Sequence, residues 1–263
     1  MKKSIFTLLL ALCTLLGANA AKKNVPQDSI RVLFIGNSYT YYNNMPAMVD
    51  SIAKSQKKLL SITRVVKGGE KFAGHLKNPK LHELLKKGGW NFVVLQEQSA
   101  MPSYPTAEVA RTTYKAAHTL DSLIVAGSPD AKVIFYMTWG HKYGCQKPWK
   151  GNYPMGNNYE GMQERLITSY LEMAYDNDAR CAPVGMAWRE IRRTHPELQL
   201  YKPDCSHPSA LGSYLVANVI YTTMFPKPYQ TGFTTEIDSS TAEIIQQIAQ
   251  QTVLNNKETL NIK

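Results

Sequence analysis

Short, almost wholly apolar runs alternate along this chain with longer segments of helical periodicity. The runs at residues 32–35, 92–95 and 133–137 contain no charged side chain. Such runs are typical of strands that are buried on both faces of a sheet. Strands that alternate with helices predict a parallel sheet with helices on both sides. The sequence therefore predicts an α/β fold, a three-layer α/β/α sandwich with a mainly parallel five-stranded sheet.

The spacing of apolar residues gives the expected elements. Strands are expected over residues 31–36, 59–66, 91–96, 132–138 and 180–184. Helices are expected over residues 45–58, 75–87, 106–126, 159–176, 186–194, 209–224 and 240–254. Ligands of parallel sheets bind beyond the carboxyl ends of the strands. The candidate segments for chemistry are therefore residues 36–38, 68–69, 96–99 and 139–141.

Residues 1–20 have the pattern of a signal peptide. Two lysines precede an apolar stretch at residues 5–16, and residues 18–20 have the small-x-small form that a signal peptidase accepts. The apolar stretch is too short for a bilayer core of about 30 Å. Cys13 would permit a lipid anchor, but the large Leu12 before it argues against lipoprotein processing. We therefore expect a secreted or periplasmic protein without stable membrane insertion.

The remaining residues, 21–263, suit a single domain with a full hydrophobic core. The formal net charge is +10, but the basic residues occur as scattered pairs, which favours solvated helix faces over a nucleic-acid partner. Three cysteines follow the signal peptide: Cys145, Cys181 and Cys205. They lack the spacing and the nearby histidines of a zinc site, so we expect no metal and no cofactor. Their pairing and the oligomeric state stay open.

Ser38 follows the first expected strand, and Asp204 lies three residues before His207 in a proline-flanked loop. A serine hydroxyl becomes nucleophilic when a base takes its proton, and a carboxylate can orient that base. Asp204 and His207 offer both groups within one turn of chain. Each signal is weak alone, because serines cap helices and the Asp-x-x-His spacing also occurs at helix starts.

Together the two segments resemble known blocks of the SGNH, or GDSL-like, hydrolases. Gly36-Asn37-Ser38 resembles their first block, G-D-S, and Asp204-Cys205-Ser206-His207-Pro208 resembles their last block, DxxHP. The resemblance implies the flavodoxin-like sandwich of that family, with Ser38 as the nucleophile, His207 as the base and Asp204 as the acid. The sequence is similar to an uncharacterised branch that has GNS and LQxxS.

The same resemblance implies an oxyanion hole. Its donors would be the N–H of Ser38, a glycine N–H after the second strand, from Gly68 or preferably Gly69, and an amide in the third block. Where the family has GxND, this chain has Leu95-Gln96-Glu97-Gln98-Ser99. A glutamine amide offers the same donors as asparagine. Gln98 aligns with that asparagine, while Gln96 is nearer the strand, and we slightly favour Gln96.

The stretch after the fourth strand is rich in aromatic side chains, which stack well on sugar rings. Trp139 and His141 of this stretch are therefore candidates for contacting the substrate, as is Asn37 beside Ser38. Trp149, Tyr153 and Tyr159 follow in the same stretch, and the alternative is that these aromatics only anchor the loop. We expect an exported esterase that acts on an acylated carbohydrate, with O-acetyl as the favoured acyl group, or on another small ester. The alternatives are a non-catalytic glycan-binding protein on the same fold and a lipase or thioesterase.

Overall fold

The computed structural model describes residues 29–145 and 154–263. The expected signal peptide, residues 1–20, lies outside these ranges, and so do Trp149 and Tyr153. Within the described ranges, no helix combines the length and the apolar character that crossing a membrane requires.

Five strands of the described chain form one sheet in which every neighbouring pair is parallel. The strands are β1 (Ile30–Gly36), β2 (Leu60–Val66), β3 (Phe92–Leu95), β4 (Lys132–Tyr136) and β5 (Arg180–Ala182). Their order is β2-β1-β3-β4-β5, so β1 lies between β2 and β3. The central strands are buried on both faces, as their apolar runs predict. The predicted α/β/α sandwich with a five-stranded parallel sheet is confirmed.

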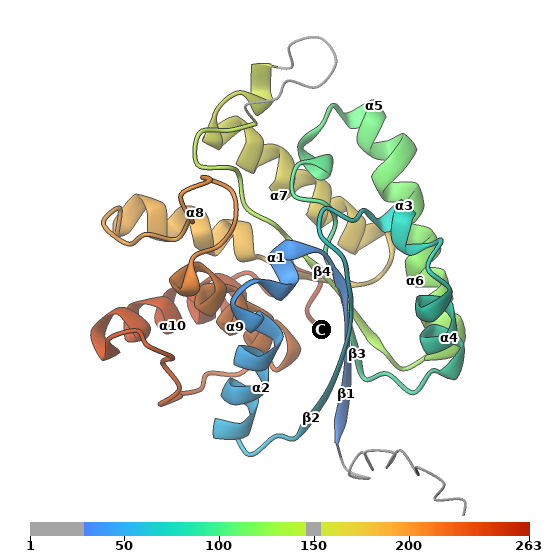
Figure 1. The fold of residues 1–263 in the computed structure, drawn as a ribbon, viewed down its shortest axis with the longest axis horizontal. Helices are drawn as coiled ribbons and strands as arrows, with labels where there is room; N and C mark the ends of the chain where they lie inside the picture. Colours follow the sequence, from blue (N-terminus) through green and yellow to red (C-terminus); the bar gives the residue numbers. More distant parts are fainter. Residues whose placement is uncertain (1–28, 146–153) are drawn as a thin grey trace, which may run out of the picture.

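Helices cover both faces of the sheet (Figure 1). They are α1 (Ser38–Tyr41), α2 (Met45–Ser55), α3 (Phe72–His75), α4 (Pro79–Lys87), α5 (Thr106–Val109), α6 (Lys115–Gly127), α7 (Tyr159–Asp176), α8 (Val184–Thr194), α9 (Ala210–Met224) and α10 (Ser239–Leu254). Helices α2, α9 and α10 lie on one side of the sheet, and α4 and α6 lie on the other. Helix α9 is buried almost all round, because it lies between the sheet and α10.

Two of the expected helices differ from the structure. The helix expected over 75–87 is interrupted, because the Asn78 side chain accepts hydrogen bonds from Lys80 N and Leu81 N and starts a new helix at Pro79. The helix expected over 106–126 contains a π-helical turn at Ala110–Tyr114. The other expected elements are present, with ends that differ by a few residues.

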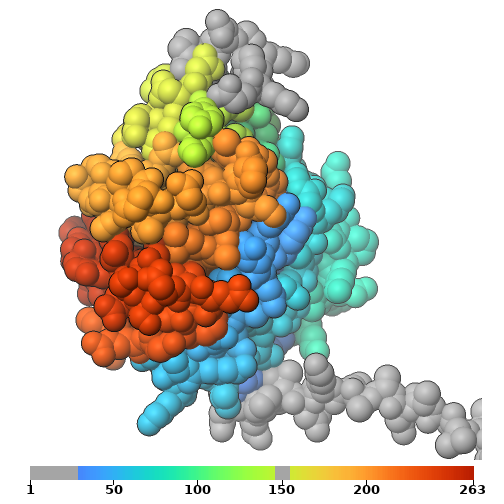
Figure 2. Space-filling model, turned by 60° about the vertical axis from the view of Figure 1, so that its left-hand side comes forward, coloured from blue at the N-terminus to red at the C-terminus, as the bar shows by residue number. Residues whose placement is uncertain are grey.

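The topology brings distant segments of sequence to the carboxyl edge of the sheet. Residues 37–44 leave β1 there, and residues 201–208 precede α9. Figure 2 shows the blue segment that follows β1 beside the orange segment near residue 200. The candidate residues of both segments are therefore close in space.

Candidate active site

The chain turns sharply between β1 and α1. Asn37 caps α1, because its Oδ1 accepts the N–H of Tyr39 at 3.1 Å, and Ser38 is the first helical residue. A Cβ atom on Gly36 would lie 2.4 Å from Thr40 Oγ1 and 2.7 Å from Gln96 Oε1, so this position requires glycine. Ser38 itself is 9% exposed. The turn thus presents one hydroxyl group at the edge of the sheet.

Asp204 and His207 lie in a tight loop before α9, residues 201–208, which we call the histidine loop. Tyr201 and Pro208 form a β-bridge that closes this loop. The Asp204 carboxylate accepts the N–H of Ser206 at 3.0 Å and that of His207 at 2.9 Å, and its Oδ2 lies 2.6 Å from His207 Nδ1. Burial alone would raise the pKa of Asp204, but these hydrogen bonds outweigh it and the pKa lies below its usual value. The carboxylate is therefore ionised at neutral pH and holds the imidazole.

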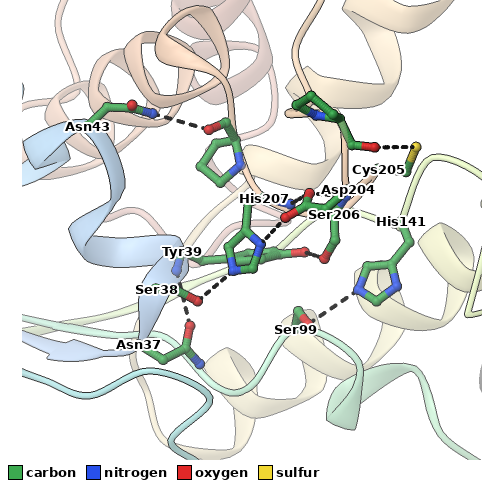
Figure 3. Close-up of polar contacts among 12 residues, drawn as sticks. Asn37, Ser38, Tyr39, Asn43, Ser99, His141, Asp204, Cys205, Ser206 and His207 are labelled. Atoms are coloured by element: carbon green, nitrogen blue, oxygen red, sulfur yellow. Dashed lines mark hydrogen bonds and ion pairs between the residues drawn. The ribbon is translucent and has the colours of Figure 1, made fainter.

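The structure brings the two segments into contact (Figure 3). His207 Nε2 lies 2.9 Å from Ser38 Oγ, across 169 residues of sequence. Because the Asp204 carboxylate can only accept, it favours the tautomer with the proton on Nδ1. Nε2 then accepts a hydrogen bond from the Ser38 hydroxyl group. This is the geometry that general-base activation of a serine requires.

Other side chains join the same two segments, and the sequence motifs did not indicate them. Tyr39 Oη lies 2.6 Å from Ser206 Oγ. Asn43 Nδ2 donates to the carbonyl oxygens of Pro208 and Ser209 at 3.1 and 3.0 Å. Asn43 has φ of 51°, in the left-handed region that asparagine tolerates. These contacts fix the approach of the histidine loop to the serine.

The structure corrects the expectation that Trp139 contacts the substrate. Its side chain is 0% exposed and stacks between Trp188, with ring centroids 4.0 Å apart, and Tyr39, at 4.4 Å. Its Nε1–H donates to the carbonyl oxygen of Ser206 at 3.0 Å. Tyr159 is also buried, at 6% exposure. These two aromatics therefore pack inside the protein, and Trp139 supports the histidine loop.

A hollow of about 260 Å³ opens beside the serine. The residues that line it are Asn37, Ser38, Tyr39, Gly69, Gln98, Ser99, His141, Ser206 and His207. Gly69 has φ of 67°, which favours glycine, whereas Gly68 is not part of the lining. The hollow thus has the expected glycine at its wall, and of the two candidates it is Gly69.

The two candidate glutamines have different surroundings. Gln96 is 0% exposed, and its Oε1 accepts the Asn37 N–H and the Thr40 hydroxyl, each at 2.9 Å, while its Nε2 donates to the carbonyl oxygen of Glu97. Both ends of its amide group are thus engaged in hydrogen bonds beneath the turn at residues 36–38, the serine turn. The slight preference for Gln96 as the oxyanion donor therefore does not fit the structure, because this side chain points into the protein and not into the hollow.

Gln98 lines the hollow. Its Oε1 accepts the N–H groups of Ala100 and Met101 at 3.0 and 3.2 Å, which fixes the orientation of the amide. Its Nε2 donates to Ser99 Oγ at 3.3 Å, and an NH₂ group has a second hydrogen to donate. Gln98 is therefore the glutamine with a donor available at the hollow.

Asn37 and His141 also line the hollow. The Asn37 side chain is 2% exposed and donates through Nδ2 to the carbonyl oxygen of Glu70, so its amide holds the turn. His141 Nε2 lies 3.3 Å from Ser99 Oγ (Figure 3). Burial, followed by the nearby His207, lowers the pKa of His141, so its ring is neutral at pH 7. Of these two side chains, only His141 is partly exposed at the hollow.

A second hollow of about 480 Å³ adjoins the first and shares Gln98, His141, Ser206 and His207 with it. Tyr104 and Tyr143 add aromatic surface to its lining. A separate hollow of about 720 Å³ lies against α10; five of its eleven lining residues are glutamines, and none is a serine, cysteine or histidine. The two hollows at the carboxyl edge are therefore the candidate location for chemistry. No cluster of three or more His, Cys, Asp or Glu side chains in the described ranges is arranged to hold a metal.

The fold and the polar residues at its carboxyl edge define a class of hydrolases built on a parallel α/β/α sandwich. A candidate SGNH hydrolase from Slackia heliotrinireducens is 29% identical to this chain, with a TM-score of 0.61, and the match covers 74% of this chain and 99% of that one. This chain belongs to the SGNH, or GDSL-like, hydrolase superfamily, as its first and last motifs predict.

Further solved structures share the fold alone. A DUF4886 family protein from Bacteroides uniformis is 16% identical, with a TM-score of 0.66 and coverage of 86% of this chain and 95% of that one. An acetylxylan esterase from Geobacillus stearothermophilus is 14% identical, with a TM-score of 0.54 and coverage of 77% and 97%. No protein-family model matches the chain, and no curated protein matches it.

Proposed function

We propose that this protein is an exported serine esterase that removes short acyl groups, O-acetyl above all, from carbohydrates. Membership of a hydrolase superfamily supports the reaction class. The observation that carries the proposal is a pair of hydrogen bonds at His207: its Nε2 lies 2.9 Å from Ser38 Oγ, and its Nδ1 lies 2.6 Å from Asp204 Oδ2. A histidine held in this way can remove the proton of a serine hydroxyl group at neutral pH.

In the proposed reaction, Ser38 Oγ attacks the ester carbonyl while His207 Nε2 takes the hydroxyl proton. The carbonyl oxygen becomes an oxyanion, which the N–H groups of Ser38 and Gly69 and the Gln98 amide stabilise. Collapse of this intermediate breaks the bond to the sugar oxygen, and His207 gives its proton to the leaving alcohol. Water then attacks the acyl-enzyme, with His207 again as the base, and releases the acid.

The dimensions of the site support a short acyl group and a larger alcohol. The hollow at Ser38 has a volume of about 260 Å³, and the adjoining one, with Tyr104 and Tyr143, about 480 Å³. Aromatic side chains at an open hollow suit a sugar ring. Export is proposed from the sequence pattern of residues 1–20.

Hydrolysis of p-nitrophenyl acetate by the purified protein tests the mechanism. Ser38→Ala should abolish release of p-nitrophenol. Ser128→Ala is the matched control: Ser128 is also buried, but its Oγ accepts the Trp90 N–H at the other end of the sheet. Equal turnover by Ser38→Ala and wild type would reject the proposed nucleophile.

Two further measurements separate the proposal from its alternatives. A fluorophosphonate should label Ser38, and a folded protein that binds glycans without being labelled would be a binding protein. A series of p-nitrophenyl esters should show a preference for acetyl, whereas a maximum at long chains would indicate a lipase or thioesterase. Acetylated xylan is the first polymer to test, because it is the named substrate class of a protein with this fold.

A further inference from the structure

Glu97 lies between the two glutamines and does not line the hollow at Ser38. Its side chain is 2% exposed. One carboxyl oxygen, Oε1, accepts two backbone N–H groups, that of Phe72 at 3.1 Å and that of Gln98 at 2.6 Å. A buried carboxyl group costs free energy unless its hydrogen bonds compensate for it. An apolar side chain would fill this buried position without that cost, so the hydrogen bonds of the carboxyl group are the feature to explain.

The two N–H groups belong to segments that leave different strands. Phe72 begins α3, three residues after Gly69, in the segment that follows β2. Gln98 lies in the segment that follows β3. The strand order β2-β1-β3 places β1 between these strands, so no ladder of the sheet joins them. At about 5 Å per strand, the gap is about 10 Å.

Hydrogen bonds already tie both segments to the end of β1. His75 Nε2 lies 3.0 Å from the carbonyl oxygen of Gly36, and Gln96 Oε1 accepts the Asn37 N–H at 2.9 Å. The Glu97 carboxyl group adds a direct tie between the outer two segments. The three segments that carry Ser38, Gly69 and Gln98 are thus linked pairwise.

We propose that Glu97 is a positioning residue for ester hydrolysis: its Oε1 fixes the separation of the Gly69 and Gln98 segments and so aligns the donors to the oxyanion. The inference rests on the proposed function, because it assigns Gly69 and Gln98 to oxyanion binding. Glu97 touches no substrate. Its burial, which raises its pKa to about 7, fits a role inside the protein.

The proposal predicts which kinetic constant changes. The donors act on charge that develops in the transition state, so their misalignment lowers kcat and leaves KM nearly unchanged. A displacement of about 1 Å can cost about 100-fold in rate. Loss of the Glu97 oxygen should therefore lower kcat by about 100-fold, while a side chain that retains an oxygen at this position should preserve it.

Three variants test this. Glu97→Leu removes the acceptor at similar volume, Glu97→Gln keeps a carbonyl oxygen at the same place, and Asp121→Leu is the control for a buried carboxyl group on α6. We expect low kcat only in Glu97→Leu, with rapid hydrogen exchange at the Phe72 and Gln98 amides in that variant alone. Wild-type kcat in Glu97→Leu, or an equal loss in Glu97→Gln and Glu97→Leu, would overturn the proposal.

The experiment also separates this inference from the proposed function. If the wild-type protein neither turns over esters nor reacts at Ser38, the proposed function fails. The structural role of Glu97 is then tested by hydrogen exchange alone: unchanged exchange at the Phe72 and Gln98 amides in Glu97→Leu would show that Glu97 does not hold these two segments together. If Glu97→Leu does not fold, Glu97→Asp takes its place in the test, because it shortens the side chain by one methylene. Low kcat in Glu97→Asp with normal kcat in Glu97→Gln supports the proposal, and normal kcat in both overturns it.

Discussion

Replacement of Glu97 by glutamine should remove a pH dependence from the stability of this protein. Burial raises the pKa of this carboxyl group from 4.5 to about 7, against the opposing effect of the Gln98 and Phe72 N–H groups. The folded protein therefore keeps the proton to a higher pH than the unfolded chain. The resulting stabilisation is fully present below about pH 4.5 and is lost as the pH rises through about 7.

The magnitude follows from the two pKa values. One pKa unit corresponds to about 1.36 kcal/mol, so the interval from 4.5 to about 7 amounts to about 3 kcal/mol. Glutamine has no such titration and keeps the oxygen that accepts the two N–H groups. The free energy of unfolding of Glu97→Gln, minus that of wild type, should therefore increase by about 3 kcal/mol between pH 4.5 and pH 8.

Urea denaturation of both proteins between pH 4.5 and pH 8 measures this difference. Other groups that titrate in the range, such as Asp121, whose pKa burial raises to about 6, are present in both proteins and cancel. A difference that stays constant with pH would refute the argument, because it would mean that the Glu97 carboxyl group titrates alike in the folded and unfolded states. A decrease with pH would show that the folded protein favours the ionised form.

The remaining predictions concern single substitutions. Gln98→Ala should lower kcat by about 10²–10³-fold at unchanged KM, since it removes one oxyanion donor; unchanged kcat would exclude that role. Gln96→Ala should instead lower the free energy of unfolding by about 1–3 kcal/mol, because two buried donors lose their acceptor. Trp139→Ala should cost about 3–5 kcal/mol in the same denaturation assay. Asp204→Asn should lower kcat by about 10²–10⁴-fold in steady-state kinetics, as it no longer stabilises the charged imidazole.

The sheet could be predicted from the sequence because its strands are marked by local composition. Residues 32–35 and 92–95 are apolar throughout, and strands that are buried on both faces allow few other side chains. Helix interruptions were harder to predict. The break at Asn78 depends on a cap that competes with helical continuation, and the π-helical turn at Ala110–Tyr114 leaves no mark in the apolar spacing.

At the site, the motifs predicted Ser38, Asp204 and His207 but not the residues that hold them together. Tyr39 and Asn43 contact the histidine loop across more than 160 residues of sequence, as the hydrogen bonds to Ser206 and Pro208 show. Such contacts depend on how the two loops approach each other. No local pattern encodes that approach.

The sequence by itself determined the sandwich, the superfamily and the three residues proposed for catalysis, because buried strands and short motifs are properties of neighbouring residues. Only the tertiary structure decided that Gln98 faces the hollow while Gln96 lies beneath the serine turn, and that Trp139 is buried between Tyr39 and Trp188. The physical reason is that the direction of a side chain beyond a strand end depends on the partners available to it. Those partners come from distant parts of the chain and meet only on folding.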